Sequence, residues 1–540
     1  MNIPLQLTTD DWLLIAACAI GLYSIILLPI RNSESWKRRG ITTWGPIPIA
    51  IFIRTKRGLA FLDKLSRPKT LWRIIATAGV PLVVLSMGYF LTLVLLMAYL
   101  MIKSPPEPSS YNAPRNILLI PGVNQYIPFV WGWIALFVTM VVHEFSHGIL
   151  SRVEGVRVKS MGLVTILIAP IAAFVEPDDE ELYGTKDKPP IVSKGARIRI
   201  ISAGVISNFI VAAIAIALFF GPVIGTIAPV DRVMISDIRS GSVAEQAGLQ
   251  SKMILLDVNS KETNNLTEVY NALQHRHAYM EMLFDNYEKN ITIQGTPAQG
   301  ILVASIFDGS PAAKAGLPER SVITEINGIK IGNLDGFRGY MNTTHPGQNI
   351  TITTAIGQSY NISLAPKFDG TGQIGIAISG NAIYIDGMTL QEFPARQFLD
   401  ILKRLPYAGI SGFFAIFLTL PFTGISGLIS GGFQGFSGWT TNFFMPTGWA
   451  APLGGYFFWI ANTLLWIGWI NLYAGLFNCL PAVPLDGGYV FKDLVQAGFE
   501  RFVSVKEAER LTRTVVAILA WLVLTSLIIS VFAPFTHGLS

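Results

Sequence analysis

Long apolar segments alternate with polar stretches along the chain. Six segments have about the 20 mostly apolar residues that a transmembrane helix needs; they are 12–30, 75–102, 127–150, 199–221, 455–480 and 512–533. The first lacks a basic start and a small-residue cleavage site and is followed by a basic stretch, so it predicts a membrane anchor rather than a signal peptide. The pattern predicts a polytopic α-helical membrane protein with about six transmembrane helices and a polar insert.

The composition narrows the class of protein in the same direction. The chain has 540 residues, of which 51% are hydrophobic and only 14% are charged, whereas an ordinary soluble chain carries about 25% charged residues. This disfavours a cytosolic enzyme, a disordered chain and a nucleic-acid-binding protein. The net charge is only +5, so the position of the basic residues matters more than their number.

The basic residues concentrate in the loop 31–73. This loop contains only two acidic residues but eleven Lys or Arg, namely Arg31, Lys37, Arg38, Arg39, Arg54, Lys56, Arg57, Lys64, Arg67, Lys69 and Arg73. The positive-inside rule places it in the cytoplasm, as a topology anchor with anionic-lipid contact as a lesser role. Because successive spans cross the membrane in alternating directions, segment 127–150 then ends on the cytoplasmic side and residues 223–400 lie outside the cell. A merely solvated loop is the alternative, although solvation does not explain the charge asymmetry.

Five N-glycosylation sequons support this orientation. They all fall within 223–400, and none falls elsewhere; they begin at Asn265, Asn290, Asn342, Asn349 and Asn361. Acceptor asparagines belong on the translocated side of a membrane, although a polar composition alone could also cluster them.

Residues 405–485 contain no Lys, Arg, Asp, Glu or His. Within them, 407–430 resembles a seventh span, but a full crossing would carry the basic stretch 492–513 to the outside. Several glycines and Pro421 also interrupt the segment. We therefore expect a re-entrant or interfacial element on the outer side, since non-helical backbone at membrane depth must be shielded by protein or line a cavity.

The polar insert contains a repeat. Residues 241–249 recur as 309–317, with six of nine positions identical at an offset of 68. Each copy predicts a strand, a Gly-Ser turn, a short helix and a further strand. The pattern resembles the PDZ domains of bacterial-type proteases, in copies at about 226–297 and 299–380. Such domains bind a peptide by adding a strand to an open sheet edge; a β-rich spacer that binds nothing is the alternative.

The motif His143-Glu144-Phe145-Ser146-His147 lies at the predicted cytoplasmic end of segment 127–150. Residues i and i+4 share a helix face, so both imidazoles can bind one zinc ion, while Glu144 reaches a water on the metal. Ionisable groups in an apolar helix are costly unless they face a polar site. The alternative is a polar helix end with satisfied core histidines.

A catalytic zinc needs a third protein ligand and one open position. The only cysteines, Cys18 and Cys479, form no thiolate framework. Topology separates the motif from the remaining histidines, which are His275, His277, His345 and His537. The candidate is Asp486, the only charged residue in 405–491, which is predicted to lie at the same membrane depth as the motif. The alternative is a helix-terminal turn, for which Asp-Gly-Gly is suitable.

Together these residues resemble the site-2 protease family of intramembrane zinc metalloproteases, in an archaeal or prokaryotic-type member. That family has an HExxH motif on one core helix and an LDG motif, here 485–487, on another. The resemblance implies one zinc per chain, bound by His143, His147 and Asp486, with Glu144 as the catalytic base.

Further segments carry the resemblance. Residues 203–208 match an Ala-Gly-Pro-x-x-Asn pattern with Val205 in place of proline, and 173–180 resembles the stretch after a re-entrant β element. Asn208 and Asn478 match positions thought to contact the substrate backbone, and interhelical packing is the alternative for both.

The predicted organisation has seven parts. They are N-terminal membrane helices (1–126), the first half of the catalytic core (127–222), the two PDZ-like copies (226–297 and 299–380), a linker with the re-entrant or interfacial segment (381–454), the second half of the core (455–500) and a C-terminal membrane helix (501–540).

The resemblance implies regulated intramembrane proteolysis. The expected partners are the lipid bilayer and single-span membrane proteins already trimmed by another protease, with no nucleic acid. The PDZ-like copies would gate or sense the substrate, and 161–176 would pair with it as a strand. Three alternatives remain: a catalytically silent scaffold or chaperone of the same family, a transporter or channel with a sensor domain, and an outward-facing zinc protease.

Overall fold

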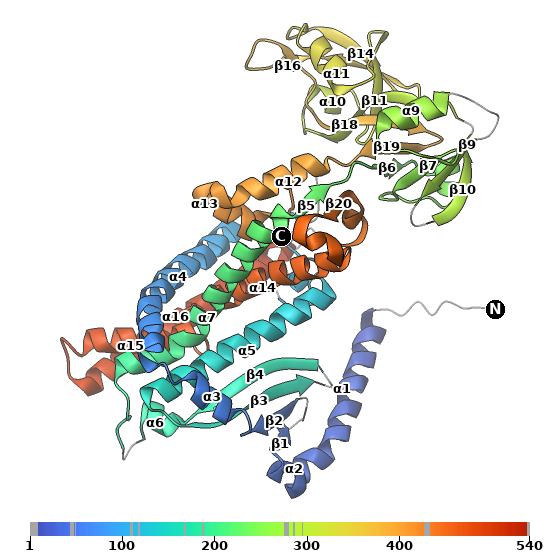
Figure 1. The fold of residues 1–540 in the computed structure, drawn as a ribbon. Helices are drawn as coiled ribbons and strands as arrows, with labels where there is room; N and C mark the ends of the chain where they lie inside the picture. The colour runs from blue at the N-terminus through green and yellow to red at the C-terminus, as the bar shows by residue number, and fades with distance from the viewer. Residues whose placement is uncertain are drawn as a thin grey trace. The chain divides into compact units, whose positions relative to one another are not determined.

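The computed structural model describes residues 9–43, 48, 50–107, 112–116, 119–166, 169–185, 188–274, 280–284, 287–293, 295–425 and 432–536. The chain divides into two compact units. The first comprises 1–217 with 463–540, and the second comprises 218–462. Figure 1 shows the elements of each unit by label.

The first unit contains helices and a small sheet. Its main helices are α1 (Thr9–Asn32), α2 (Glu34–Arg38), α3 (Leu59–Leu65), α4 (Lys69–Lys103), α5 (Phe129–Glu154), α6 (Asp179–Tyr183), α7 (Lys194–Leu218), α14 (Tyr456–Asn478, which begins in the second unit), α15 (Asp486–Phe499) and α16 (Val505–Thr536). Its strands are β1 (Ile41–Thr43), β2 (Ile51–Thr55), β3 (Val158–Ile166) and β4 (Ala169–Pro177).

Five helices are long and apolar enough to cross a membrane. They are Lys69–Lys103, Phe129–Glu154, Lys194–Val223, Tyr456–Asn478 and Val505–Phe535. They coincide with five of the six predicted spans, which supports a multi-pass membrane protein. The sixth predicted span, 12–30, lies in α1. The side chains of residues 9–20 are outside the described part of the chain, so this span stays a prediction.

The small sheet has the order β1-β2-β3-β4, and all its neighbouring strands are antiparallel. The hairpin of β3 and β4 contains the predicted β element at 161–176. The other two strands come from the basic loop 31–73, where Ile53 pairs with Leu163. The loop expected to act as a topology anchor therefore also extends the sheet beside the predicted site.

A buried ion pair holds α15 against α7. The guanidinium of Arg197 donates from Nε to Asp493 Oδ2 at 2.6 Å and from Nη2 to Asp493 Oδ1 at 2.5 Å. Arg197 also donates to the carbonyl of Leu182. Loss of one partner from such a pair typically costs about 3–5 kcal/mol, because the remaining charge stays buried. The pair therefore fixes the helix that begins at Asp486 relative to α7.

The second unit contains an eight-stranded sheet with the order β15-β14-β12-β11-β18-β19-β6, in which β13 also pairs with β12. The bounds of these strands are β6 (Val233–Ile238), β11 (Ala298–Ile306), β12 (Val322–Ile326), β13 (Ile329–Lys330), β14 (Asn349–Thr354), β15 (Ser359–Ser363), β18 (Ile376–Ile385) and β19 (Met388–Glu392). A four-stranded sheet has the order β10-β9-β7-β8 and comprises β7 (Leu255–Val258), β8 (Lys261–Glu262), β9 (Met280–Phe284) and β10 (Tyr287–Ile293).

Short helices follow the strands of each PDZ-like copy. The first copy contains α8 (Val243–Gln246) and α9 (Leu266–Gln274), and the second contains α10 (Pro311–Lys314) and α11 (Leu334–Met341). The remaining elements are η1 (Pro114–Asn116), η2 (Phe219–Val223), β5 (Ile227–Pro229), β16 (Ala365–Pro366), β17 (Gly372–Gln373), α12 (Ala395–Arg404), η3 (Leu405–Tyr407), α13 (Gly409–Phe414), η4 (Ala415–Thr419), η5 (Gly438–Phe443), β20 (Phe444–Pro446) and η6 (Gly448–Leu453).

The two PDZ-like copies are nested rather than consecutive. Strand β19 pairs with β6 of the first copy (Figure 1). Ile383, Ile385, Met388 and Leu390 lie in the hydrophobic core of that copy. Residues 381–392, which were predicted to belong to a linker, therefore complete the first copy. The repeat did not reveal this, because the closing strand follows the second copy and falls outside the 68-residue offset.

The segment 407–430 forms no long helix in its described residues. Its apolar helical part runs from Gly409 to Thr419, which is shorter than the about 20 residues needed to cross a membrane. Residues 426–431 lie outside the described part of the chain. The re-entrant or interfacial position of this segment stays a prediction.

Candidate metal centre

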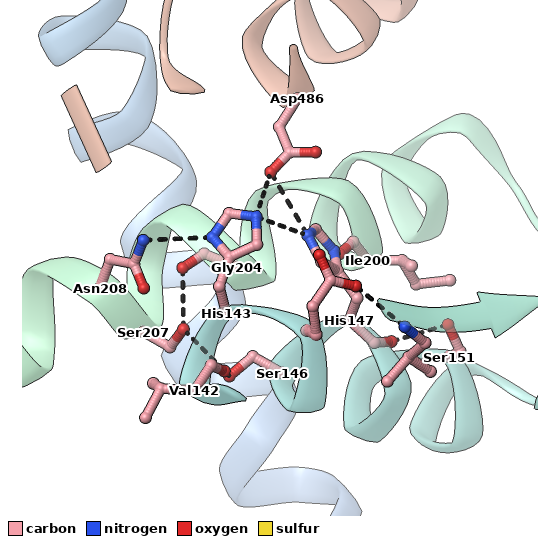
Figure 2. Close-up of polar contacts among 12 residues, drawn as sticks. Val142, His143, Ser146, His147, Ser151, Ile200, Gly204, Ser207, Asn208 and Asp486 are labelled. Atoms are coloured by element: carbon pink, nitrogen blue, oxygen red, sulfur yellow. Dashed lines mark hydrogen bonds and ion pairs between the residues drawn. The ribbon is translucent and has the colours of Figure 1, made fainter. Parts of the chain in front are cut away.

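Helix α5 brings the two histidines of the HEFSH motif to one point. Their Nε2 atoms are 3.2 Å apart. Asp486, the first residue of α15, places its Oδ2 atom 3.1 Å from His143 Nε2 and 3.3 Å from His147 Nε2 (Figure 2). Among the described residues, these three side chains form the only group of three or more potential metal ligands. Residues 343 positions apart in the sequence thus meet at one site.

The donor atoms fit a zinc ion. Tetrahedral zinc with bonds of about 2.0 Å separates neighbouring ligand atoms by about 3.3 Å, close to the observed distances. Asp486 Oδ2 is buried, and apart from the two imidazoles no hydrogen-bond partner for it is found among the described residues. Two imidazole lone pairs and a carboxylate oxygen facing one another repel unless a cation lies between them. Nitrogen and oxygen ligands in this number suit zinc.

Helix α7 fixes the orientation of His147. The Nδ1 atom of His147 lies 2.9 Å from the carbonyl oxygen of Ile200. A carbonyl only accepts, so Nδ1 carries the hydrogen and donates it, which leaves the Nε2 lone pair directed at Asp486. Such a partner on the far nitrogen of a metal-binding histidine selects the tautomer and holds the ring.

Asn208 has the equivalent position beside His143. Its amide Nδ2 lies 3.2 Å from His143 Nδ1, and its Oδ1 is buried without a hydrogen-bond partner among the described residues. The oxygen and nitrogen of an amide are assigned from such networks rather than observed. Turning the amide over lets Oδ1 accept from His143 Nδ1–H. Asn208 is thus a positioning residue for His143, and its predicted contact with the substrate backbone stays a prediction.

Glu144 lies beside the three candidate metal ligands but is not one of them. Its Oε2 accepts a hydrogen bond of 3.0 Å from the backbone N–H of Val175 on β4. The carboxylate is therefore held next to the edge of the sheet and remains available for proton transfer. Its role as the base stays a prediction.

Gly204 allows α7 to pass against the histidines. A Cβ atom at this position would lie 2.5 Å from His147 Nε2 and 2.6 Å from His143 Cε1. These separations are shorter than real Cβ contacts. In the sequence Gly204 belongs to a family pattern, but its contact with the histidines was not predicted. A glycine inside a long apolar helix was the available signal.

The other candidates lie elsewhere or cannot be described. Asn478 is the last residue of α14 and is half-buried. One turn earlier, Gly475 of α14 packs against Phe209 and Asn208 of α7. His345 is exposed in the second unit, and His275, His277 and His537 lie outside the described residues.

Comparisons with known proteins find a matching peptidase family and curated relatives. The model of peptidase family M50 matches residues 131–522. The chain is 30% identical over 266 residues to an uncharacterized protein of Methanocaldococcus jannaschii, an alignment that covers 49% of this chain and 64% of the relative. It is 29% identical over 246 residues to the protease RseP of Yersinia pestis, covering 36% of this chain and 53% of the relative. The chain thus covers less than two-thirds of the length of these curated relatives.

A solved structure is similar to a small part of the chain. The PDZ domain of an SdrC-like protein from Listeria monocytogenes is 30% identical, and the match covers 15% of this chain and 86% of that domain with a TM-score of 0.14.

Proposed function

The chain belongs to peptidase family M50, the site-2 zinc metalloproteases, and on this premise we propose that it is a zinc-dependent endopeptidase that cleaves transmembrane segments of membrane proteins. The observation that carries the proposal is the meeting of His143, His147 and Asp486 within 4.8 Å of one another. Two of the helices long and apolar enough to cross a membrane adjoin this group, since α5 carries both histidines and α7 carries Gly204 and Asn208.

Each residue of the site has a separate role in the proposed reaction. His143, His147 and Asp486 would hold the metal, and Asn208 and the Ile200 carbonyl would orient the two imidazoles. Zinc, when bound, supplies a Lewis acid that makes water nucleophilic near neutral pH. Glu144 would take a proton from the attacking water and then deliver it to the leaving amine of the peptide.

The edge of β4 offers a place for an unwound substrate. A transmembrane helix hides its peptide bonds in its own hydrogen bonds, so it must become extended before it is cut. Strand β4 is an edge strand of the sheet. The N–H of Val175 points away from β3 and towards Glu144. Because backbone groups alternate along a strand, the groups of Ala173 point the same way. A substrate strand paired here would lie directly beside the catalytic base.

Ala173→Pro tests this edge. Proline removes the outward N–H and leaves the β3–β4 ladder intact, so cleavage should fall about tenfold, the equivalent of one hydrogen bond. Zinc content should be unchanged. Ala173→Val keeps the N–H and is the matched control. Equal cleavage by the proline variant and the valine variant would show that the edge of β4 does not bind the substrate.

Removal of the metal tests the proposed activity. We expect the purified chain to cleave a single-span reporter in detergent or vesicles, to lose that activity after chelation and to regain it with one equivalent of zinc. A three-donor protein site leaves the fourth position for chemistry, so the loss should be complete. Cleavage that persists in metal-free protein contradicts the proposal. Metal binding without any cleavage would favour a silent scaffold, and the absence of both would favour a transporter.

The natural substrates are proposed to be single-span membrane proteins already trimmed outside the membrane by another protease. The PDZ-like copies would exclude untrimmed proteins or sense the new terminus. No nucleic-acid partner is proposed, because the net charge is only +5 and the densest group of basic residues is the membrane-adjacent loop 31–73.

The proposed orientation places the metal centre towards the cytoplasm and the PDZ-like copies outside. It rests on the basic loop 31–73 and on the sequons within 223–400. Single cysteines introduced at Lys56 and at Asn361 should react with an impermeant maleimide from the cytoplasmic and the outer side, respectively. Reaction of both from the same side would contradict this orientation.

A further inference from the structure

The side chain of Arg197 lies where three elements of the first unit meet. It starts on α7 and donates two hydrogen bonds to Asp493 on α15. From Nη1 it donates a third, of 3.3 Å, to the carbonyl oxygen of Leu182 on α6. Its Cζ atom also lies 5.4 Å from the ring centroid of Tyr183, the last residue of α6. Arg197 is 7% exposed and Asp493 is 3% exposed, so one buried side chain joins α6, α7 and α15.

Each of these three elements also holds one part of the candidate metal centre. Helix α15 begins with Asp486, and α7 supplies the carbonyl of Ile200 that orients one histidine ring. Helix α6 follows β4 in the chain, and Leu182 lies in the same hydrophobic core as Val175 of β4 and Ile200. The contacts of Arg197 therefore reach the third ligand, a histidine-orienting group and the strand beside the predicted base.

The spacing of the contacts on α15 matches the spacing on α7. Asp486 and Asp493 are seven residues apart, which is about two helical turns, so both side chains leave one face of α15. Arg197 and Gly204 are also seven residues apart on α7, and Gly204 lies against the two imidazoles that face Asp486 (Figure 2). Seven residues rise about 10 Å along either helix. The pair of Arg197 and Asp493 therefore sets both the depth and the rotation at which α15 presents Asp486.

The form of this contact suits a positioning role. Arg197 places Nε on one oxygen of Asp493 and Nη2 on the other. Such a two-pronged pair fixes direction as well as distance, whereas a lysine offers a single point of charge. A buried ion pair adds little net stability compared with apolar side chains of similar volume. Stability alone therefore does not account for two charges at this position.

We propose that Arg197 is a positioning residue for the metal centre, which acts through Asp493 to hold Asp486 against the two imidazoles. The inference rests on the proposed zinc site, and it adds a residue that contacts neither the metal ligands nor the substrate. It differs from a purely structural role in one respect that can be measured. Zinc affinity should follow the geometry of the pair, and the stability of the metal-free chain should follow only its charge balance.

Arg197→Lys separates geometry from charge. Lysine keeps a positive charge beside Asp493 and removes the fork, so the metal-free chain should unfold at close to the wild-type temperature. Zinc affinity, measured by competition with a chelator on the full chain in detergent, should fall about tenfold, the lower end of the loss typical for an orienting partner. Wild-type zinc affinity in this variant would overturn the proposal.

A paired apolar replacement gives the same test without a buried charge. Arg197→Met alone leaves Asp493 unpaired and should lower the thermal stability of the metal-free chain. Adding Asp493→Leu removes the unpaired charge and should restore that stability. Zinc affinity should remain about tenfold below wild type in the double variant, because apolar contacts do not define the rotation of α15. Recovery of both quantities together would show a purely structural pair and overturn the proposal.

The double variant Lys194→Met with Glu500→Leu is the matched control. These residues form an ion pair between the same two helices, but their side chains are 30% and 25% exposed. Glu500 also lies just beyond the end of α15. A partly exposed single-point pair contributes little, so zinc affinity should stay close to wild type. An equal loss in this control and in the apolar replacement of Arg197 and Asp493 would show that Arg197 has no specific role.

The spectrum of the cobalt-loaded chain reports the geometry of the ligands directly. Arg197→Lys should change the visible absorption bands of bound cobalt, because the carboxylate of Asp486 moves relative to the two imidazoles. The control variant at Lys194 and Glu500 should keep the wild-type bands. Identical spectra for wild type and Arg197→Lys would overturn the proposal.

Hydrogen exchange in the metal-free chain separates this inference from the proposed activity. The amides of residues 489–493 should exchange faster in Arg197→Lys than in wild type, whether or not the protein cleaves a reporter, and equal exchange would contradict the proposal. Zinc binding by wild type without cleavage would contradict only the proposed protease. Cleavage by wild type with equally tight zinc binding by Arg197→Lys would contradict only the positioning role of Arg197.

Discussion

Glu144→Gln is expected to abolish cleavage of a single-span reporter while zinc stays bound at about one ion per chain. Glu144 lies outside the donor group formed by His143, His147 and Asp486, so its amide should not release the metal. The amide oxygen can still accept the hydrogen bond from Val175. It cannot take a proton from water, and loss of general-base catalysis costs about 10²–10⁴-fold in rate.

The control for this variant is Glu180→Gln on the exposed face of α6, which makes the same chemical change away from the metal centre. Reporter cleavage and zinc content should be measured on the same preparations. Undiminished cleavage by Glu144→Gln would exclude Glu144 as the base. Loss of zinc together with cleavage would show instead that Glu144 supports the metal site.

The metal ligands could be predicted because their surroundings contain few charges. His143 and His147 stand at helical spacing in an apolar segment, and Asp486 is the only charged residue in 405–491. Because placing such groups near lipid is costly, the sequence alone predicts a functional reason for them. The five long helices could be predicted for a similar reason, since an apolar run of sufficient length is a local property.

The features that escaped prediction depend on contacts between distant residues. Strands β1 and β2 are short pieces of a basic loop, and they become strands through pairing with β3. Strand propensity is weak outside such a context. Residues 381–392 complete the first PDZ-like copy only because the second copy is inserted before them. Asn208 matched a family position, but its approach to His143 required the packing of α7 against α5.

Gly204→Ala is expected to remove zinc and activity while the fold is retained. Alanine stabilises a helix by about 1 kcal/mol relative to glycine, so α7 should not unfold. The new Cβ atom would lie 2.5 Å from His147 Nε2 and 2.7 Å from His143 Nδ1. Both imidazoles must then move, or α7 must move away from α5. Either movement separates the donor atoms and releases the hydrogen bonds that orient the rings.

Loss of a single orienting partner typically costs 10–100-fold in metal affinity, and displacement of two ligands should cost about 100-fold or more. Gly88→Ala in α4 is the matched control, because a Cβ atom at Gly88 meets no atom within 4 Å. Zinc affinity by competition with a chelator, reporter cleavage and thermal unfolding should be compared for both variants. If Gly204→Ala retained wild-type zinc affinity and cleavage, the close approach of α7 to the two histidines would be wrong, and with it the orienting roles of Ile200 and Asn208.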